Sequence, residues 1–285
     1  NRDSPSGPVT ITVEDGGPLV ATLRIESDAP GCSGLVRRVR VVDGLGYVEL
    51  INTVDKLKER RPEGVYFSFP FNIPKAVSRV DTPLAVVQVE KDQMPGANRN
   101  FYCVQRWVDL SNDDYGVTWV TLDAPMMQFD PIRIAVPQGL NLWRTAIDPG
   151  SHIYTWVMNN HWETNYKADQ EGLVTFRYAV IPHAGGYNAV DAQRVGRAIH
   201  QPLVAVTVDR ATSVIEPLLQ ALPPGIIATS IRPSRDHEGT LIRMINTADD
   251  PQHVQLKWHR EVGDTWISNP WRRKFVRPLL LSKWP

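Results

Sequence analysis

The densest group of residues that could bind a ligand runs from Asn159 to Tyr166. It reads Asn-Asn-His-Trp-Glu-Thr-Asn-Tyr and stands between two stretches with the pattern of β-strands. Sugars need planar amides and carboxylates for their hydroxyl groups and an aromatic ring for their apolar face, and this segment offers both. We therefore predict substrate contacts from these side chains: Asn159, Asn160, His161, Trp162 and Asn165. The same composition suits turns, and Trp162 would equally fill a core, so the residues alone leave both interpretations open.

A second polar and aromatic group lies between residues 92 and 107. From this group we predict that Gln93 and Arg99 contribute to a binding surface. The planar guanidinium of Arg99 can hold a carboxylate or a pair of hydroxyl groups through parallel hydrogen bonds. The alternative is a long loop that Asp and Asn turns close.

No set of residues identifies a catalytic centre, and we predict no catalytic and no metal-binding residue in this chain. Glycoside hydrolysis requires two carboxylates about 5–9 Å apart. The sequence offers several candidates but does not pair them: Asp92, Asp109, Asp113, Asp114 and Glu163. The histidines and the two cysteines, Cys32 and Cys103, lack the spacing of a tetrahedral metal site. We expect the cysteines to be buried thiols or, alternatively, one disulfide.

The elements that must position these residues are mainly β-strands. The 23 Pro and 19 Gly residues are spread along the whole sequence, which leaves little room for long helices. Apolar and polar residues alternate in many short stretches, beginning with two that flank Asp15-Gly16-Gly17. So many strands predict two large antiparallel sheets packed face to face. We expect a helix over residues 190–199, and at most a single turn over residues 213–222 because this segment contains Pro217.

Two domains are predicted, a large β-domain at residues 1–206 and a small one at residues 207–285. Nucleic acid is not an expected partner, because 31 Lys and Arg residues balance 31 Asp and Glu residues. A membrane is not expected either, since no apolar run approaches the roughly 18 residues of a membrane span. The sequence starts at Asn1 without a leader pattern, so we expect a piece of a longer protein, and the cellular compartment stays open.

Four stretches resemble the C-terminal β region of glycoside hydrolase family 38, the α-mannosidases and their bacterial relatives. They are VELINTVDK at residues 48–56, VYFSFPFNIP at residues 65–74, and the longer blocks at residues 92–125 and 159–183. Residues 201–250 resemble the passage from the large sandwich of that family into a small final domain. The resemblance implies an all-β chain, with a large antiparallel, galactose-mutarotase-like supersandwich followed by a small terminal β-sandwich domain.

In that family the chemistry belongs to an N-terminal α/β-barrel domain, which carries the zinc ligands and an aspartate nucleophile. The resemblance therefore implies that zinc is bound outside this chain, by an upstream catalytic domain of the same polypeptide. It also implies that Arg243 approaches the active site. Our leading interpretation is the C-terminal β-sandwich portion of an α-mannosidase-like glycoside hydrolase. This portion would support the catalytic domain and contribute substrate-cleft loops, and it would not be catalytic alone.

Two alternatives remain open from the residues. One is a free-standing carbohydrate-binding or sugar-epimerising module, in which His161 and Glu163 form an acid–base pair on one face of a strand. The other is a structural interaction domain, a homo-oligomer whose interface takes up some of the nine Trp residues.

Overall fold

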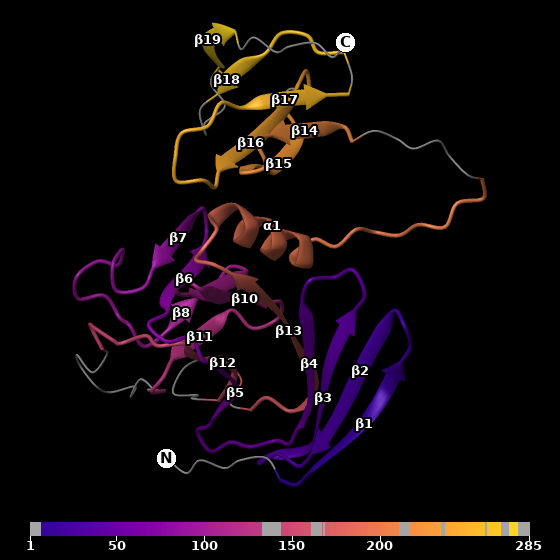
Figure 1. The fold of residues 1–285 in the computed structure, drawn as a ribbon, viewed down its shortest axis with the longest axis vertical. Coiled ribbons are helices and arrows are strands. Elements are labelled where there is room, and N and C mark those ends of the chain that lie inside the picture. The colour runs from indigo at the N-terminus through magenta and orange to yellow at the C-terminus, as the bar shows by residue number, and fades with distance from the viewer. Residues whose placement is uncertain are drawn as a thin grey trace. The chain divides into compact units, whose positions relative to one another are not determined.

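The computed structural model describes residues 7–132, 144–160, 167, 169–210, 217–234, 237–259, 261–268 and 274–278. These residues form nineteen β-strands and one α-helix (Figure 1). The chain divides into two compact units, Asn1–Asn188 with Arg194–Gln201, and Ala189–Gln193 with Pro202–Pro285. The domain boundary expected between residues 206 and 207 stays a prediction.

The first unit contains a nine-stranded and a four-stranded antiparallel sheet. The order of the larger sheet is β1 (Val9–Gly16), β2 (Val20–Ser27), β3 (Cys32–Val42), β4 (Val48–Lys56), β13 (Gly172–Ala184), β10 (Tyr115–Thr121), β9 (Trp107–Ser111), β6 (Val77–Thr82) and β7 (Ala85–Gln88). The order of the smaller sheet is β5 (Gly64–Pro70), β12 (His152–Asn159), β11 (Met126–Phe129) and β8 (Tyr102–Cys103).

The hydrophobic core lies between these two sheets. Phe69 of β5 packs edge-on against Trp119 of β10 and Tyr178 of β13, with ring centroids 5.2 and 4.9 Å apart. Met127 of β11 and Ile153 of β12 are completely buried in the same cluster. Apolar residues at every second position of the strands therefore produce the predicted sandwich, because alternate side chains of a strand point to one face.

The second unit is also all-β beyond its helical residues. Its strands pair in three two-stranded antiparallel sheets: β14 (Leu219–Leu222) with β17 (Gln255–Trp258), β15 (Ile226–Pro233) with β16 (Thr240–Asn246), and β18 (Trp266–Ser268) with β19 (Lys274–Pro278). The expectation of at most one turn over residues 213–222 is wrong for the last four residues, which form β14. Pro217 lies two residues before this strand, so it removes no hydrogen bond from the ladder between β14 and β17.

The predicted helix is confirmed as α1 (Ala189–His200). Its C-terminal half packs in the first unit, where a Cβ atom added to Gly196 would lie only 2.4 Å from Cδ1 of Trp107. In the last turn, Nε2 of His200 lies 2.8 Å from the carbonyl oxygen of Thr121. Glycine at position 196 therefore lets the helix backbone approach the buried indole of Trp107 closely.

Neither cysteine forms a disulfide, since Cys32 and Cys103 are both free thiols. The expectation that both are buried is wrong, because Cys103 is exposed and Cys32 is only half-buried. In the part of the chain that the structure describes, no helix has the length and apolar character needed to span a membrane.

The close approach at Gly196 makes a stability prediction. Gly196→Ala should lower the free energy of unfolding by about 1–3 kcal/mol, because the added methyl group overpacks against Trp107. The sign of this change in unfolding free energy tests the packing. In a helix without such a close contact, Ala would instead stabilise by about 1 kcal/mol relative to Gly. Chemical denaturation measures the change, with Gly46→Ala as the control because no atom lies within 4 Å of its added Cβ. A variant more stable than the parent would contradict the packing described here.

Candidate functional site

A row of aromatic side chains lies on the outer face of the four-stranded sheet. In β12, Ile153 and Thr155 point into the core and are fully buried, so Trp156 faces the other way. Trp156 is stacked on Tyr66 of β5 at a centroid distance of 6.0 Å and an interplanar angle of 3°. It is also stacked on Phe101, at 4.9 Å and 22°. All three rings are half-buried and form one aromatic row.

Backbone geometry at Gly64 allows this row to form. A Cβ atom at this position would lie 2.9 Å from both Nε1 of Trp156 and Cε2 of Tyr66, which is closer than side chains tolerate. Glycine at the first position of β5 therefore lets both rings lie against the strand.

The hydroxyl group of Tyr66 is buried and makes no hydrogen bond with the described residues. Burial raises the pKa of Tyr66 to about 12, so the phenol is neutral at physiological pH and has a proton to donate. Native structures satisfy nearly all buried polar atoms, so this hydroxyl has an unused donor beside the aromatic row, as do other buried groups of the described residues such as Tyr102.

Polar side chains continue along the same outer face of β12. His152 and Tyr154 are stacked with centroids 4.4 Å apart. Nε2 of His152 lies 2.7 Å from Oγ of Ser68, and the hydroxyl of Tyr154 donates to Oδ1 of Asp130 at 3.2 Å. Aromatic faces beside hydroxyl, imidazole and carboxylate groups are the combination that sugars require.

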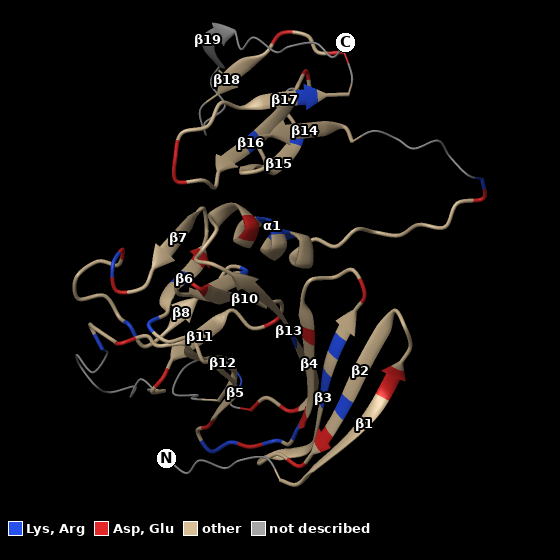
Figure 2. Ribbon diagram, viewed as in Figure 1, with Lys and Arg blue, Asp and Glu red and all other residues tan. Residues whose placement is uncertain are grey.

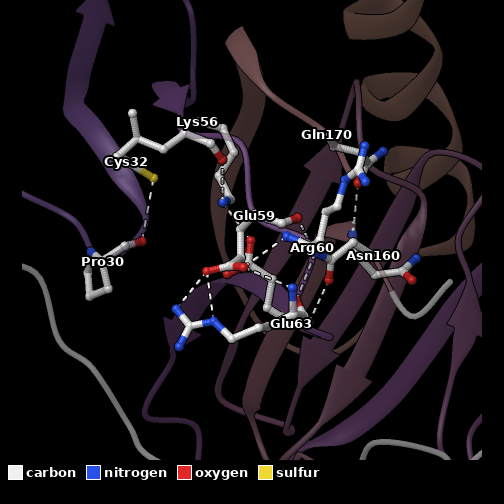
Figure 3. A network of polar contacts seen from close by, with 11 residues as sticks. Pro30, Cys32, Lys56, Glu59, Arg60, Glu63, Asn160 and Gln170 are labelled. Atoms are coloured by element: carbon white, nitrogen blue, oxygen red, sulfur yellow. Dashed lines mark hydrogen bonds and ion pairs between the residues drawn. The ribbon is translucent and has the colours of Figure 1, made fainter. Parts of the chain in front are cut away.

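Beyond the row, the chain leaves β12 through Asn159 and Asn160 and enters the segment 161–166. Asn160 is buried, with a relative exposure of 3%. Its side-chain nitrogen donates to the carbonyl oxygens of Glu59 and Arg61 at 2.7 and 2.9 Å, and its side-chain oxygen accepts from the backbone N–H of Glu63 at 2.6 Å. Asn160 therefore fixes the loop before β5 to the end of β12 (Figure 3).

The other side of this segment is fixed as well. The side-chain oxygen of Gln170 accepts a hydrogen bond of 3.0 Å from the backbone N–H of Asn159. The buried carboxylate of Asp169 pairs with Arg60 at 3.1 Å, with Lys167 at 3.3 Å and with Lys58 at 3.5 Å. Burial raises the pKa of Asp169, but the hydrogen bonds from Arg60 and Lys167 and the nearby positive charges outweigh burial and hold it at about 2.

A second buried charge completes this network. The ammonium group of Lys56, at the end of β4, lies 2.5 Å from Oε1 of Glu63 and donates to the carbonyl oxygen of Leu57 at 2.9 Å. Burial raises the pKa of the nearby Cys32 thiol, which stays protonated and lies 3.7 Å from the carbonyl oxygen of Pro30 (Figure 3). An open hollow is lined by Lys56, Glu63, Val65, Met158, Asn159, Asn160 and Gln170. Its cavity volume of about 10 Å³ is no more than one water molecule needs, so the aromatic row and not this hollow is the better candidate for ligand contact.

The structure places the predicted site residues in three groups. Asn159 and Asn160 lie together beside the aromatic row, but the amide of Asn160 is committed to backbone atoms of the 59–63 loop. Gln93 and Arg99 share a second loop, in which the Gln93 side chain accepts from the N–H of Glu90 at 3.0 Å and Arg99 donates to the carboxylate of Glu90 at 3.0 Å. The guanidinium of Arg99 is buried and also donates to the carbonyls of Ala97 and Met94, so it closes this loop.

Arg243 lies on β16 of the second unit, is exposed, and makes no ion pair with the described residues. His161, Trp162 and Asn165, together with Glu163, lie outside the described residues. Substrate contact by any of the predicted site residues stays a prediction.

Sequence reasoning did not identify Tyr66, Phe101 or Trp156 as site residues. The signal for two of them was present in the alternation of HIYTWVMN and VYFSFP, where the residues between the core positions are aromatic. Among the carboxylates considered for acid–base chemistry, Asp109 is buried and accepts from Ser111 at 2.6 Å and Thr118 at 3.0 Å. Nε2 of His183 lies 3.0 Å from the same carboxylate, so Asp109 joins three strands of the large sheet.

Comparison with known proteins agrees with the fold and with the predicted resemblance. Residues 2–124 match the profile of the glycosyl hydrolases family 38 C-terminal domain. The resemblance to the C-terminal β region of family 38 is confirmed by this match. No curated protein matches the sequence closely enough to count as a relative.

Two solved structures show the same fold. One is an α-mannosidase from Enterococcus faecalis V583, with 13% identity and a TM-score of 0.72. The match covers 96% of this chain and 33% of that chain. The other is a protein in glycosyl hydrolase family 38 from Enterococcus faecalis, with 13% identity, a TM-score of 0.71, and coverage of 96% and 34%. The chain thus spans about a third of the length of each structure.

The charge network predicts how stability depends on pH. Since the pKa of Asp169 is lower in the folded state than its ordinary value of 3.8, its carboxylate contributes stability that is complete above about pH 4 and is lost as pH falls through 2. Asp169→Asn should therefore lower the melting temperature at pH 7, and the difference from the parent should vanish near pH 2.

Thermal melts of both proteins between pH 7 and pH 2 measure this convergence. Asp43→Asn is the control, because it removes the same charge from an exposed turn. A gap between Asp169→Asn and the parent that stayed constant down to pH 2 would show that Asp169 does not act through its charge.

Proposed function

We propose that this chain is the C-terminal β-sandwich part of an α-mannosidase-like glycoside hydrolase. In this proposal it supports a catalytic domain of the same polypeptide and lines part of the substrate cleft. The cleft surface consists of the aromatic row, Tyr66, Phe101 and Trp156, and of the segment that follows Asn160. The observation that carries the proposal is the match of residues 2–124 to the family 38 C-terminal domain, and the stacked rings of the aromatic row support the cleft surface.

The role of each group follows from its chemistry. The half-buried rings offer an apolar surface to one face of a sugar, and the neutral phenol of Tyr66 donates a hydrogen bond to a sugar oxygen. The network fixes Asn160 and Asp169, and the predicted contacts His161, Trp162 and Asn165 lie between these two residues in the sequence. Positioning by such fixed supports is what a binding surface on loops requires.

The zinc ion that the family resemblance implies is proposed to lie in the upstream domain. Among the described residues, no three side chains of His, Cys, Asp or Glu gather closely enough to hold a metal ion. The proposal assigns zinc binding and the chemical step of glycoside cleavage to the upstream domain.

Activity measurements test the proposal. Tyr66→Phe in the complete polypeptide should reduce kcat/KM for an aryl α-mannoside by about three- to tenfold, because one neutral hydrogen bond contributes about 0.5–1.5 kcal/mol. Trp156→Ala should reduce it further, and the 285-residue chain alone should be inactive with zinc present.

Tyr47→Phe serves as the matched control, since Tyr47 is a half-buried tyrosine outside the aromatic row. Activity of the 285-residue chain by itself would refute the assignment of chemistry to another domain. Unchanged kcat/KM in both Tyr66→Phe and Trp156→Ala would remove the aromatic row from the cleft.

A further inference from the structure

One face of strands β1, β2 and β3 carries apolar side chains that are exposed to solvent. Cross-strand pairs in the register Val13↔Leu23↔Val39 and Ala21↔Val41 place their side chains on one face of the sheet. We call the side chains Val9, Ile11, Val13, Leu23, Val39 and Val41 the wing face. Its outermost members are strongly exposed, with relative exposures of 62% for Ile11 and 69% for Val13.

The wing face continues the core-facing side of the large sheet. Val39 pairs with Leu50 of β4, and Leu50 pairs with Tyr178 of β13, which belongs to the buried core. The same side of one sheet is thus buried under β12 and β5 at one end and open at the other. Arg37 is the one charged side chain of β3 on this face.

The opposite face of the same strands carries charged side chains. Arg38 donates to Glu14 at 2.5 and 3.0 Å, Arg24 donates to Glu26 at 2.8 Å, and Arg40 lies 3.4 Å from Glu49. These charged strands are marked in Figure 2. A sheet with one charged and one apolar face normally buries the apolar one, so the wing face is the side that lacks its cover.

Additional strands of the smaller sheet would lie over the wing face and cover it. This sheet has four strands against nine in the larger one, and β5 is one of its two edge strands. Val65 of β5 and Lys56 of β4 line the same hollow, so the second layer ends above β4. Strands added to β5 would continue this layer over β3, β2 and β1 at the spacing of about 10 Å that packed sheets keep.

We propose that the wing face is covered in the whole protein by β-strands that extend the smaller sheet from β5. These strands come from the part of the polypeptide outside these 285 residues. This inference rests on the proposed longer polypeptide, and the chain's share of about a third of each solved structure leaves ample length for them. A second copy of this chain fits less well, because it would have to bring a whole sheet to the wing face and would leave the edge of β5 unpaired.

Ile11→Lys tests the inference in two proteins, the 285-residue chain and the complete polypeptide. In the 285-residue chain the side chain is exposed, so the melting temperature should change by less than about 1 °C. In the complete polypeptide the same lysine would be buried unpaired, and the melting temperature should fall by about 5 °C or more. Thr10→Lys is the control, because Thr10 lies on the charged face opposite Glu26 and should be neutral in both proteins.

Hydrogen exchange of the β5 backbone amides gives a second readout that needs no variant. Exchange in the complete polypeptide should be at least about tenfold slower than in the 285-residue chain, because an added strand pairs the open edge. Equal exchange in both proteins, together with a neutral Ile11→Lys, would overturn the inference. A dimeric 285-residue chain that Ile11→Lys converts to monomers would overturn it in favour of a second copy. Either failure leaves the Tyr66→Phe activity result untouched, so the two proposals fail separately.

Discussion

The two-residue period of β12 is the constraint on which the candidate site depends. Ile153 and Thr155 are completely buried between the sheets, and Thr155 is fixed further by a hydrogen bond of 2.8 Å to the hydroxyl of Tyr178. With these positions fixed, His152, Tyr154 and Trp156 have no alternative to the outer face. A slip of one residue would bury the indole and imidazole and expose the core positions. The packing energy of the sandwich therefore also positions the aromatic row of the candidate site.

The charged network beside the aromatic row fixes loops and strand ends. Lys56 and Asp169 are buried ions, and an unpaired buried ion is costly, so each is surrounded by opposite charges and hydrogen-bond partners. Such networks rarely add much stability compared with apolar packing, but they tolerate only one arrangement of their partners. The arrangement here joins the end of β4, the loop before β5, the end of β12 and the approach to β13. It thereby fixes Asn160 and Asp169 through partners that are distant in sequence.

Fold class was predictable from the sequence because it depends on local alternation and on Pro and Gly positions. The strands His152–Asn159 and Val48–Lys56 and the helix Ala189–His200 illustrate this, since each pattern decides which face is apolar. Site residues were less predictable, because the role of a polar side chain depends on partners far away in the chain. Asn160 and Arg99 have side chains suited to ligand binding, yet both are committed to closing loops. Asn160 bonds to backbone atoms, and Arg99 donates to the carboxylate of Glu90 and to backbone carbonyls. Tyr66 and Trp156 look like core residues in sequence, and only the register between β5 and β12 places them side by side on the outside.

The binding surface and the wing face both follow from an unequal sandwich. The nine-stranded sheet supplies more apolar surface than the four-stranded sheet covers, and the smaller sheet keeps its outer aromatic face half-exposed. An isolated sandwich would gain stability by equalising its two layers, since exposed apolar faces and open edges both favour association. A sandwich that is one part of a larger polypeptide has no such need, because neighbouring segments can complete it. The unequal layers therefore account for both proposed contact surfaces, one for strands that would complete the core and one for the proposed substrate cleft.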